Sequence, residues 1–283
     1  MSVHLGIGSW TDPVDAGVLF PEDLPAKQRL AHYSTVFDHV EVNSSFYRTP
    51  TAATTSAWAR QTRPGFIFHL KLHRAFSQSP AKTAQEGKLG EYLLEAAAPL
   101  IRAGKLGAFL LVMPPSFGPE QRKLAELDAV VEKLQPHALA VELRHRAWVA
   151  DGQRDHTLGY FRERKLTWVA VDMPQIKGST IMPAIDEVTN PDLAYLRLHG
   201  RNPAWLTAKS AADRHLHDYT ARELEQIVAR IATLRGAAKQ VHVVANNHAL
   251  DFAPKAALAL QGLIGKTARP SARKATPARR GAR

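Results

Sequence analysis

The stretch ALAVELRHRAWVADGQRDHTLGYFRERKLTWVAVD, residues 138–172, decides the fold class. It begins with a short apolar, β-branched run, continues through a helix-forming segment at 153–164, and ends in a second apolar run. A strand, a helix and a strand in that order are typical of an α/β protein. The stretch therefore predicts one repeating unit of such a fold.

The same alternation recurs through residues 1–265, which we interpret as one domain. The other apolar runs begin at Val3, His39, Phe66, Leu106, Ala194 and Val241, and the other helix-forming segments lie at 25–36, 51–62, 86–103, 119–134, 218–235 and 252–264. Eight strands with intervening helices predict a single (β/α)8 TIM-barrel-like domain, with a doubly wound sheet as the alternative. Residues 173–192 contain three prolines and have weak periodicity, so we expect a long loop there in place of the sixth helix.

The basic charge of the chain is concentrated at its C-terminal end. The 37 Lys and Arg against 26 Asp and Glu give a formal net charge of +11, but seven of the basic residues fall in 266–283. That segment has no acidic residue, which predicts a disordered basic tail that attracts nucleic acid non-specifically. The remaining 30 basic and 26 acidic residues leave the body close to neutral.

Composition excludes several classes of protein and site. The absence of cysteine excludes disulfides, thiolate nucleophiles and iron–sulfur clusters. No stretch approaches the roughly 20 apolar residues of a membrane span. The N-terminal sequence MSVHLGIGSW enters a strand pattern without the basic and apolar regions of a signal peptide. We therefore expect a cytoplasmic protein without membrane contact, and its oligomeric state stays open.

Polar side chains gather at the C-terminal ends of six of the eight predicted strands. They recur at every second residue, and in a barrel one such face lines the lumen, whose mouth binds ligands. The residues are Glu41 with Asn43, His69 with Lys71, Glu142 with Arg144, Arg197 with His199, Asp172 alone, and Asn246 with Asn247. Opposed charges in a narrow mouth are costly to bury without a ligand or a satisfied network. The pattern predicts a functional pocket, and an internal ion-pair network that fills the barrel is the structural alternative.

The chemistry of these residues predicts acid–base catalysis on an anionic ligand. Carboxylates and imidazoles suit proton transfer, which we assign to Glu41, Glu142, His199 and Asp172. Cationic and amide groups suit a phosphate or carboxylate, and two aromatic residues complete the predicted binding set: Asn43, Tyr47, Lys71, Arg144, His145, Arg197, Arg201, Asn246, Asn247 and Trp10. Packing under a loop is the alternative for the two aromatic residues, and helix capping for Asn247.

Five motifs resemble those of the YecE-like family, a family of unknown function with a TIM-barrel-like fold. They are HVEVNSSFYRTP at 39–50, LGAFLLVMPPSF at 106–117, AVELRHRAW at 140–148, YLRLHGR at 195–201 and VVANNHALDFAPKAAL at 243–258. The resemblance covers the body in order and implies the barrel fold, but no reaction. It departs after the third strand, where members commonly have a Thr-His pair, and at Met113, where they have Gln.

The sequence thus predicts a hydrolase or isomerase whose mouth binds a small phosphorylated or otherwise anionic ligand, with no cofactor. One alternative is a nucleic-acid-binding protein, with a base beside Trp10 or Tyr47. Another is a metal-dependent phosphodiesterase or nuclease-like barrel. Its divalent metal would be held by Glu41, His69, Glu142, Asp172 and His199. Lys71, Arg144 and Arg197 argue against that metal, because their positive charge repels a cation.

Overall fold

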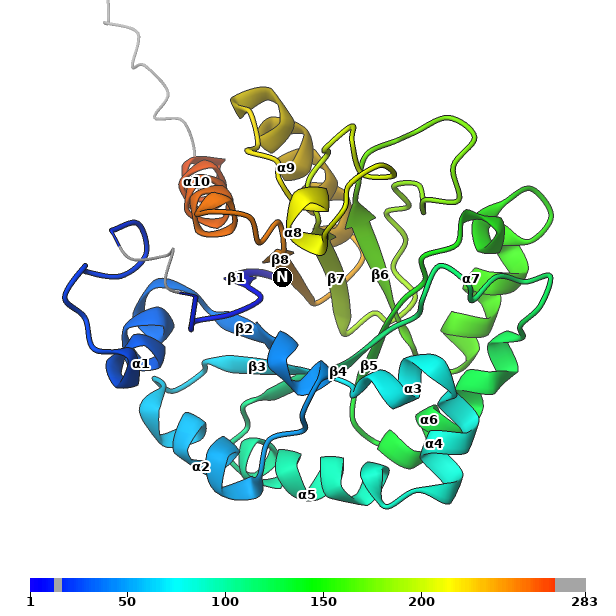
Figure 1. Cartoon of the computed structure of the whole chain (residues 1–283), viewed down its shortest axis with the longest axis horizontal. Helices are drawn as coiled ribbons and strands as arrows, with labels where there is room; N and C mark the ends of the chain where they lie inside the picture. The colour runs from blue at the N-terminus through cyan, green and yellow to red at the C-terminus, as the bar shows by residue number, and fades with distance from the viewer. Residues whose placement is uncertain (13–16, 268–283) are drawn as a thin grey trace, which may run out of the picture.

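The protein is a closed barrel of parallel strands, in which each strand pairs with its neighbours in sequence and β1 pairs with β8. This computed structural model describes residues 1–12 and 17–267. The strands are β1 (Ser2–Ile7), β2 (His39–Val42), β3 (Ile67–Lys71), β4 (Leu106–Val112), β5 (Leu139–Glu142), β6 (Thr167–Asp172), β7 (Leu193–Leu198) and β8 (Gln240–Ala245). Figure 1 shows them surrounded by helices. The predicted (β/α)8 barrel is confirmed, and the sheet is not doubly wound.

Most of the helices occupy the segments predicted for them. These are α1 (Ala26–Val36), α2 (Ala52–Gln61), α5 (Leu89–Arg102), α7 (Arg154–Glu163), α9 (Ala221–Arg235) and α10 (Phe252–Thr267). The prediction for 119–134 was too long, because a 3-10 turn, η3 (Leu124–Leu127), precedes the short α6 (Asp128–Leu134). The 173–192 segment has neither helix nor strand, as expected.

Several short helices were not predicted from the sequence. They are α3 (Arg74–Gln78), α4 (Pro80–Glu86), α8 (Ala211–Arg214) and the 3-10 turns η2 (Asn43–Phe46) and η4 (Arg146–Val149). Two of them lie close to strand ends that carry polar residues: η2 follows β2 directly, and η4 begins at Arg146, shortly after β5 ends at Glu142. They therefore help to position the loops at the mouth of the barrel.

The C-terminal helix ends close to the predicted domain boundary. Helix α10 continues to Thr267, two residues past the expected end of the body at Gly265. The rest of the predicted basic tail, 268–283, lies outside the described residues, so its predicted role in nucleic-acid binding stays a prediction. Among the residues that the structure describes, no helix is long and apolar enough to cross a bilayer.

The register of the strands determines which side chains face the lumen. Arg197 on β7 is paired with Val171 on β6 and with Val244 on β8. Leu196 and Leu198 alternate with it and are buried on the opposite face, toward the helices. Asp172 is paired with Leu198, so its side chain belongs to the helix-facing side.

Glycines in β1 and β4 leave room for polar side chains inside the barrel. A Cβ atom on Gly6 would lie 2.1 Å from the carbonyl oxygen of His39, and one on Gly107 would lie 2.6 Å from Cε1 of His69. On the outer face the packing is apolar, as where Phe68 of β3 stacks on Trp58 of α2 with 5.8 Å between ring centroids. The hydrophobic core thus lies between strands and helices, and the lumen is polar.

Candidate functional site

Arg197 lies at the centre of a buried cluster of charged side chains in the lumen. Its Nη2 donates to Glu41 Oε1 at 2.7 Å and its Nε donates to Glu41 Oε2 at 3.0 Å, while its Nη1 donates to Glu142. The side chain of Arg197 is 1% exposed, and both carboxylates are fully buried. Residues from β2, β5 and β7 therefore share one ion-pair network, which is the structural alternative allowed by the sequence.

His199 extends this network toward the mouth. Its Nε2 lies 3.1 Å from Glu142 Oε2, and its Nδ1 lies 3.1 Å from Asn246 Nδ2. A carboxylate only accepts and an amide nitrogen only donates, so Nε2 carries the proton and Nδ1 is the acceptor. The Asn246 Oδ1 accepts in turn from Arg197 Nη2 at 3.0 Å. Asn246 thus fixes both the guanidinium and the imidazole.

The protonation states follow from these contacts. Burial opposes ionisation of Glu41 and Glu142, but the Arg197 guanidinium keeps the pKa of each carboxyl below its ordinary value. Burial lowers the pKa of His199 to about 3, although Glu142 acts in the opposite direction. Both glutamates are therefore ionised at neutral pH and His199 is neutral. In this state neither glutamate can serve as a general acid, and the neutral imidazole has a nitrogen that can accept a proton.

Tyr195 is a member of the cluster that sequence reasoning missed. Its hydroxyl donates to Glu41 Oε2 at 2.9 Å, and its ring lies edge-on to His69 with centroids 4.9 Å apart. The signal was present, because Tyr195 and Arg197 are two residues apart and share the lumen-facing side. Within the run AYLRLHG a tyrosine counts as apolar, and the polar end of its side chain was overlooked.

Lys71 and Arg144 bring further positive charge to the cluster. Arg144 Nε donates to Glu142 Oε1 at 2.7 Å, and the Arg144 side chain is 31% exposed. The Lys71 ammonium lies 4.6 Å from the centroid of the Phe46 ring and makes no hydrogen bond or ion pair within the described part of the chain. Burial, with Arg197 as the next cause, lowers the pKa of Lys71 to about 8. These two cations lie at the boundary between the buried network and solvent.

Asn43 adds an unsatisfied acceptor next to this network. Its Nδ2 donates to the Gly8 carbonyl and to Asn246 Oδ1, both at 3.2 Å. Its Oδ1 is buried and has no hydrogen-bond partner within 1–12 and 17–267. A buried amide oxygen without a donor is unfavourable, so this atom is suited to a ligand hydroxyl or a water molecule.

Asp172 and Arg201 form a separate network, outside the lumen. Arg201 contacts both carboxylate oxygens of Asp172, at 2.9 and 2.8 Å, and the Arg230 Nη1 of α9 donates to Asp172 at 2.9 Å. Tyr219 also donates to Asp172, at 2.8 Å. Both Asp172 and Arg201 line a cavity of about 520 Å³ next to the 173–192 loop. The structure therefore does not bring Asp172 to the other three residues that we assigned to proton transfer.

Four more residues of the predicted binding set do not join the network. Trp10 packs edge-on against Trp58 and Phe68, on the helix side of β3. Tyr47 is 73% exposed in the loop after η2. His145 accepts from the Ala147 amide at the start of η4, and Asn247 Nδ2 donates to the His217 carbonyl. For Trp10, His145 and Asn247 these contacts hold loops in place.

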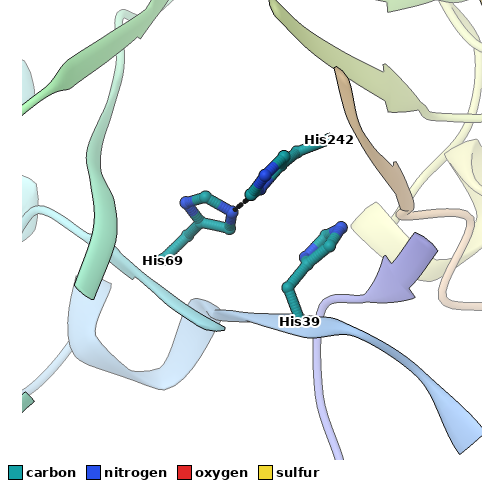
Figure 2. A group of neighbouring side chains, drawn as sticks. All are labelled: His39, His69 and His242. Carbon is teal, nitrogen blue, oxygen red and sulfur yellow. Dashed lines mark hydrogen bonds between the residues drawn. The ribbon is translucent and has the colours of Figure 1, made fainter. Parts of the chain in front are cut away.

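A second group of titratable side chains lies deeper in the barrel. His39, His69 and His242 are buried, and one nitrogen of each ring lies within 4.8 Å of those of the other two (Figure 2). His69 is therefore not part of a metal site with Glu41, Glu142, Asp172 and His199, as the metal alternative supposed. Asp172 binds arginines outside the lumen, and the two glutamates bind Arg197. That five-residue metal site is absent.

Comparison with protein families settles the membership of this chain. Residues 4–280 match the model of DUF72, described as a protein of unknown function. The chain belongs to the DUF72 family. The UPF0759 protein YunF of Bacillus subtilis is 24% identical over 87% of this chain and 89% of its own length. YecE of Escherichia coli is 28% identical over 55% of this chain and 53% of its own length. The resemblance to the YecE-like family is therefore confirmed.

Solved DUF72 structures have the same fold. One from Enterococcus faecalis has a TM-score of 0.84 and 27% identity, and the match covers 93% of this chain and 95% of that one. One from Thermotoga maritima has a TM-score of 0.79 and 28% identity over 94% of this chain and all of the other. Both are described as DUF72 family proteins, so the comparisons establish family and fold, and the function has to be argued from the site.

Proposed function

We propose that the C-terminal mouth of the barrel binds a small anionic ligand, phosphorylated or carboxylated. The observation that supports this proposal is an excess of positive charge. Arg197, Arg144 and Lys71 stand against two ionised carboxylates, Glu41 and Glu142, so one positive charge has no counter-charge in the network. An uncompensated cation in a partly buried site is unfavourable, and a bound anion removes that cost.

The surplus charge lies on the side of the network that a ligand can reach. Only Nε of Arg144 is hydrogen-bonded within the described residues, which leaves both Nη groups to donate to a phosphate or carboxylate. The Lys71 ammonium supplies a second donor, and Asn43 Oδ1 supplies an acceptor for a hydroxyl of the same ligand. A hydroxylated phosphate ester or carboxylate combines these groups.

The proposed reaction class is hydrolysis or isomerisation, with proton transfer at His199. The neutral imidazole is oriented by Glu142 on one side and Asn246 on the other. A ligand that takes over the hydrogen bond of the Asn246 amide leaves His199 Nδ1 free to accept a proton. Glu142 then stabilises the imidazolium that forms, because its carboxylate is already hydrogen-bonded to Nε2.

Calorimetry with orthophosphate, sugar phosphates and hydroxy acids tests the proposal. Lys71→Met and Arg144→Met each remove one donor, and we expect at least one compound to bind wild type about tenfold more tightly than either variant. Lys27→Met and Arg102→Met are matched controls, since these residues are exposed on α1 and α5. If every compound that binds wild type binds the Lys71→Met/Arg144→Met double variant equally well, the mouth is not an anion site.

A metal-dependent phosphodiesterase has less support. The carboxylates that would hold the cation are each hydrogen-bonded to Arg197, and a divalent ion would have to displace that guanidinium. Displacement leaves a buried arginine without a counter-charge, which is strongly unfavourable. We therefore propose the anion site alone for the mouth.

A further inference from the structure

A cavity opens at the other end of the barrel, opposite the mouth. It measures about 870 Å³ and is lined by the N-terminal ends of the strands and the loops that precede them, with Ile67, Gly107, Gln240 and His242 among its lining residues. Gly107 has no side chain to separate this cavity from the His69 ring, which a Cβ atom there would approach to 2.6 Å. The cavity therefore reaches His242, one of the three buried histidines, and passes close to His69.

The three imidazoles face one another across the lumen (Figure 2). His69 Nε2 and His242 Nδ1 are 2.7 Å apart, and the rings of His39 and His242 stack with centroids 5.0 Å apart. The residues come from β2, β3 and β8, so strands distant in sequence meet at this point. Three buried imidazoles with no carboxylate among them form a donor set that suits Zn²⁺, Co²⁺, Ni²⁺ or Cu²⁺ rather than Mg²⁺ or Ca²⁺.

The hydrogen bonds around the rings leave nitrogens free to bind a metal. His39 Nε2 lies 3.3 Å from the carbonyl oxygen of His4 and donates to it, so His39 Nδ1 carries the lone pair. His242 Nε2 donates to Gln240 Oε1 at 3.1 Å, which directs the Nδ1 lone pair of His242 toward His69. This is the arrangement of metal-binding histidines, whose second nitrogen commonly donates to a carbonyl or carboxylate.

Two of these buried nitrogens have no partner. His39 Nδ1 and His69 Nδ1 make no hydrogen bond within the described residues, and a buried lone pair without a donor is costly. The Nδ1 atom of His4 is in the same situation, and the His4 ring lies 4.8 Å from that of His242. A cation held by His39 Nδ1, His69 Nε2 and His242 Nδ1 gives His39 Nδ1 the partner that it lacks.

We propose that His39, His69 and His242 bind one divalent transition-metal ion of the Zn²⁺ and Co²⁺ class. Metal–nitrogen distances of about 2.0–2.1 Å place tetrahedral ligand atoms about 3.3 Å apart. The pair at 2.7 Å has to open slightly, and nitrogens up to 4.8 Å apart have to approach. The remaining coordination position is open to His4 or to water from the cavity.

The bound ion joins β2, β3 and β8 at the end of the barrel opposite the mouth. In barrels of this class that end contributes to stability and the other end to chemistry. We therefore assign the ion a structural role, and its binding is independent of any ligand at Lys71 and Arg144. If the calorimetry finds no anion site at the mouth, the metal proposal is unaffected. If the histidines bind no metal, the anion proposal is unaffected.

The first test uses the full-length protein after treatment with EDTA. Titration with Co²⁺ should give one equivalent bound, with the visible absorption bands of a tetrahedral site, and Zn²⁺ should displace it. Bound metal should raise the unfolding temperature. X-ray absorption of the loaded wild type should show three or four imidazole ligands. No binding at micromolar Co²⁺ or Zn²⁺, or a ligand shell with fewer than two imidazoles, overturns the proposal.

A second test changes the exposed partner of one ligand and then that ligand itself. Gln240 is exposed at the start of β8, so Gln240→Met removes only the acceptor for His242 Nε2. We expect Gln240→Met to weaken Co²⁺ binding at least tenfold and Gln240→Glu to retain it or make it tighter. His242→Gln should abolish binding, with His156→Gln, an exposed histidine, as the matched control. Equal affinity in Gln240→Met, Gln240→Glu and wild type contradicts the assigned ligand set.

Discussion

A single guanidinium, that of Arg197, keeps two glutamates ionised inside the barrel. Glu41 and Glu142 come from different strands of the barrel, and Arg197 is the buried cation that both of them contact. Arg144 also contacts Glu142, but it is partly exposed and its charge is screened by water. The stability of this buried network therefore depends mainly on the Arg197 side chain.

Arg197→Met should be severely destabilising. It leaves two buried carboxylates without their main counter-charge, and we expect the free energy of unfolding to fall by about 3–5 kcal/mol. Urea denaturation at pH 7 measures the loss. Arg162→Met, which removes an exposed pair with Glu187, is the control and should cost about 1 kcal/mol or less. A triple variant that adds Glu41→Gln and Glu142→Gln should recover part of the stability. No recovery would contradict the buried-charge explanation.

Gly6 is required because the lumen has no room for a methyl group beside β2. The Cβ atom of Gly6→Ala would overlap the backbone of His39, and we expect a loss of about 1–3 kcal/mol. Gly159→Ala in α7 is the matched control, since no atom lies within 4 Å of its added Cβ. There, alanine should stabilise the helix by about 0.5–1 kcal/mol. Thermal denaturation of both variants distinguishes the two outcomes, and equal effects would contradict this packing.

At the level of single residues, strand alternation predicted much of the cluster. The period of two placed Glu41, Glu142 and Arg197 on lumen-facing sides, and they meet there. Asp172 was misplaced because alternation within one strand does not say which of its faces points to the lumen. Its pairing with Leu198 on β7 shows that Asp172 faces the helices. The histidine group was missed because His69 was assigned to the mouth, and His39 and His242 were not linked to it. Its members lie two positions before polar residues on β2 and β3.

Local capping sets the start of α9, the long helix that packs outside β7 and β8. Thr220 Oγ1 accepts from the Glu223 amide at 3.3 Å, and Glu223 Oε2 accepts from the Thr220 amide at 2.9 Å. Thr220→Ala removes half of this capping box and should cost about 1 kcal/mol. Thr35→Ala on the exposed side of α1 is the control, within about 0.5 kcal/mol of wild type. Urea midpoints measure both, and equal losses would rule out a special role for the cap.

Among the elements, the strands and long helices were predictable and the short helices were not. Apolar runs and helical spacing are strong signals over ten or more residues. Helices α3 and α4 have only five and seven residues, and packing of Phe76 and a proline at the start of α4 stabilise them rather than periodicity. Segment 119–134 was overextended because its composition favours helix while the chain first makes a 3-10 turn at η3.

For the whole molecule, four buried histidines and the partly buried His248 make stability sensitive to acid. Burial lowers the pKa of His39 and His248 to about 4 and of His199 to about 3, and it lowers the pKa of His69 and His242 well below 6.5. The folded state keeps them neutral, whereas the unfolded chain protonates them below about pH 6.5. The free energy of unfolding therefore keeps the whole contribution of these histidines above this pH, and it decreases as the pH falls toward 4.

Unfolding temperatures measured in EDTA between pH 7.5 and 4.5 test this sensitivity. Each neutral histidine contributes a loss of up to about 1.4 kcal/mol per pH unit, so we expect a steep decrease that starts near pH 6.5. His199→Asn should lower the number of protons taken up on unfolding by about one, and so reduce the dependence of stability on pH. His156→Gln, at an exposed position, should leave that dependence unchanged. A constant unfolding temperature from pH 7.5 to 5 would show that the buried histidines do not titrate in this way.

Closure of the barrel between β1 and β8 has a consequence for synthesis on the ribosome. Glu41 emerges 156 residues before Arg197, and Asn43 emerges 203 residues before Asn246. Until those partners appear, the polar faces of the early strands have to remain hydrated, because burying Glu41 alone is strongly unfavourable. The nascent chain therefore cannot complete the lumen in stages. Only when β8 has left the ribosome does the first strand find its second neighbour, so closure of this barrel waits for β8.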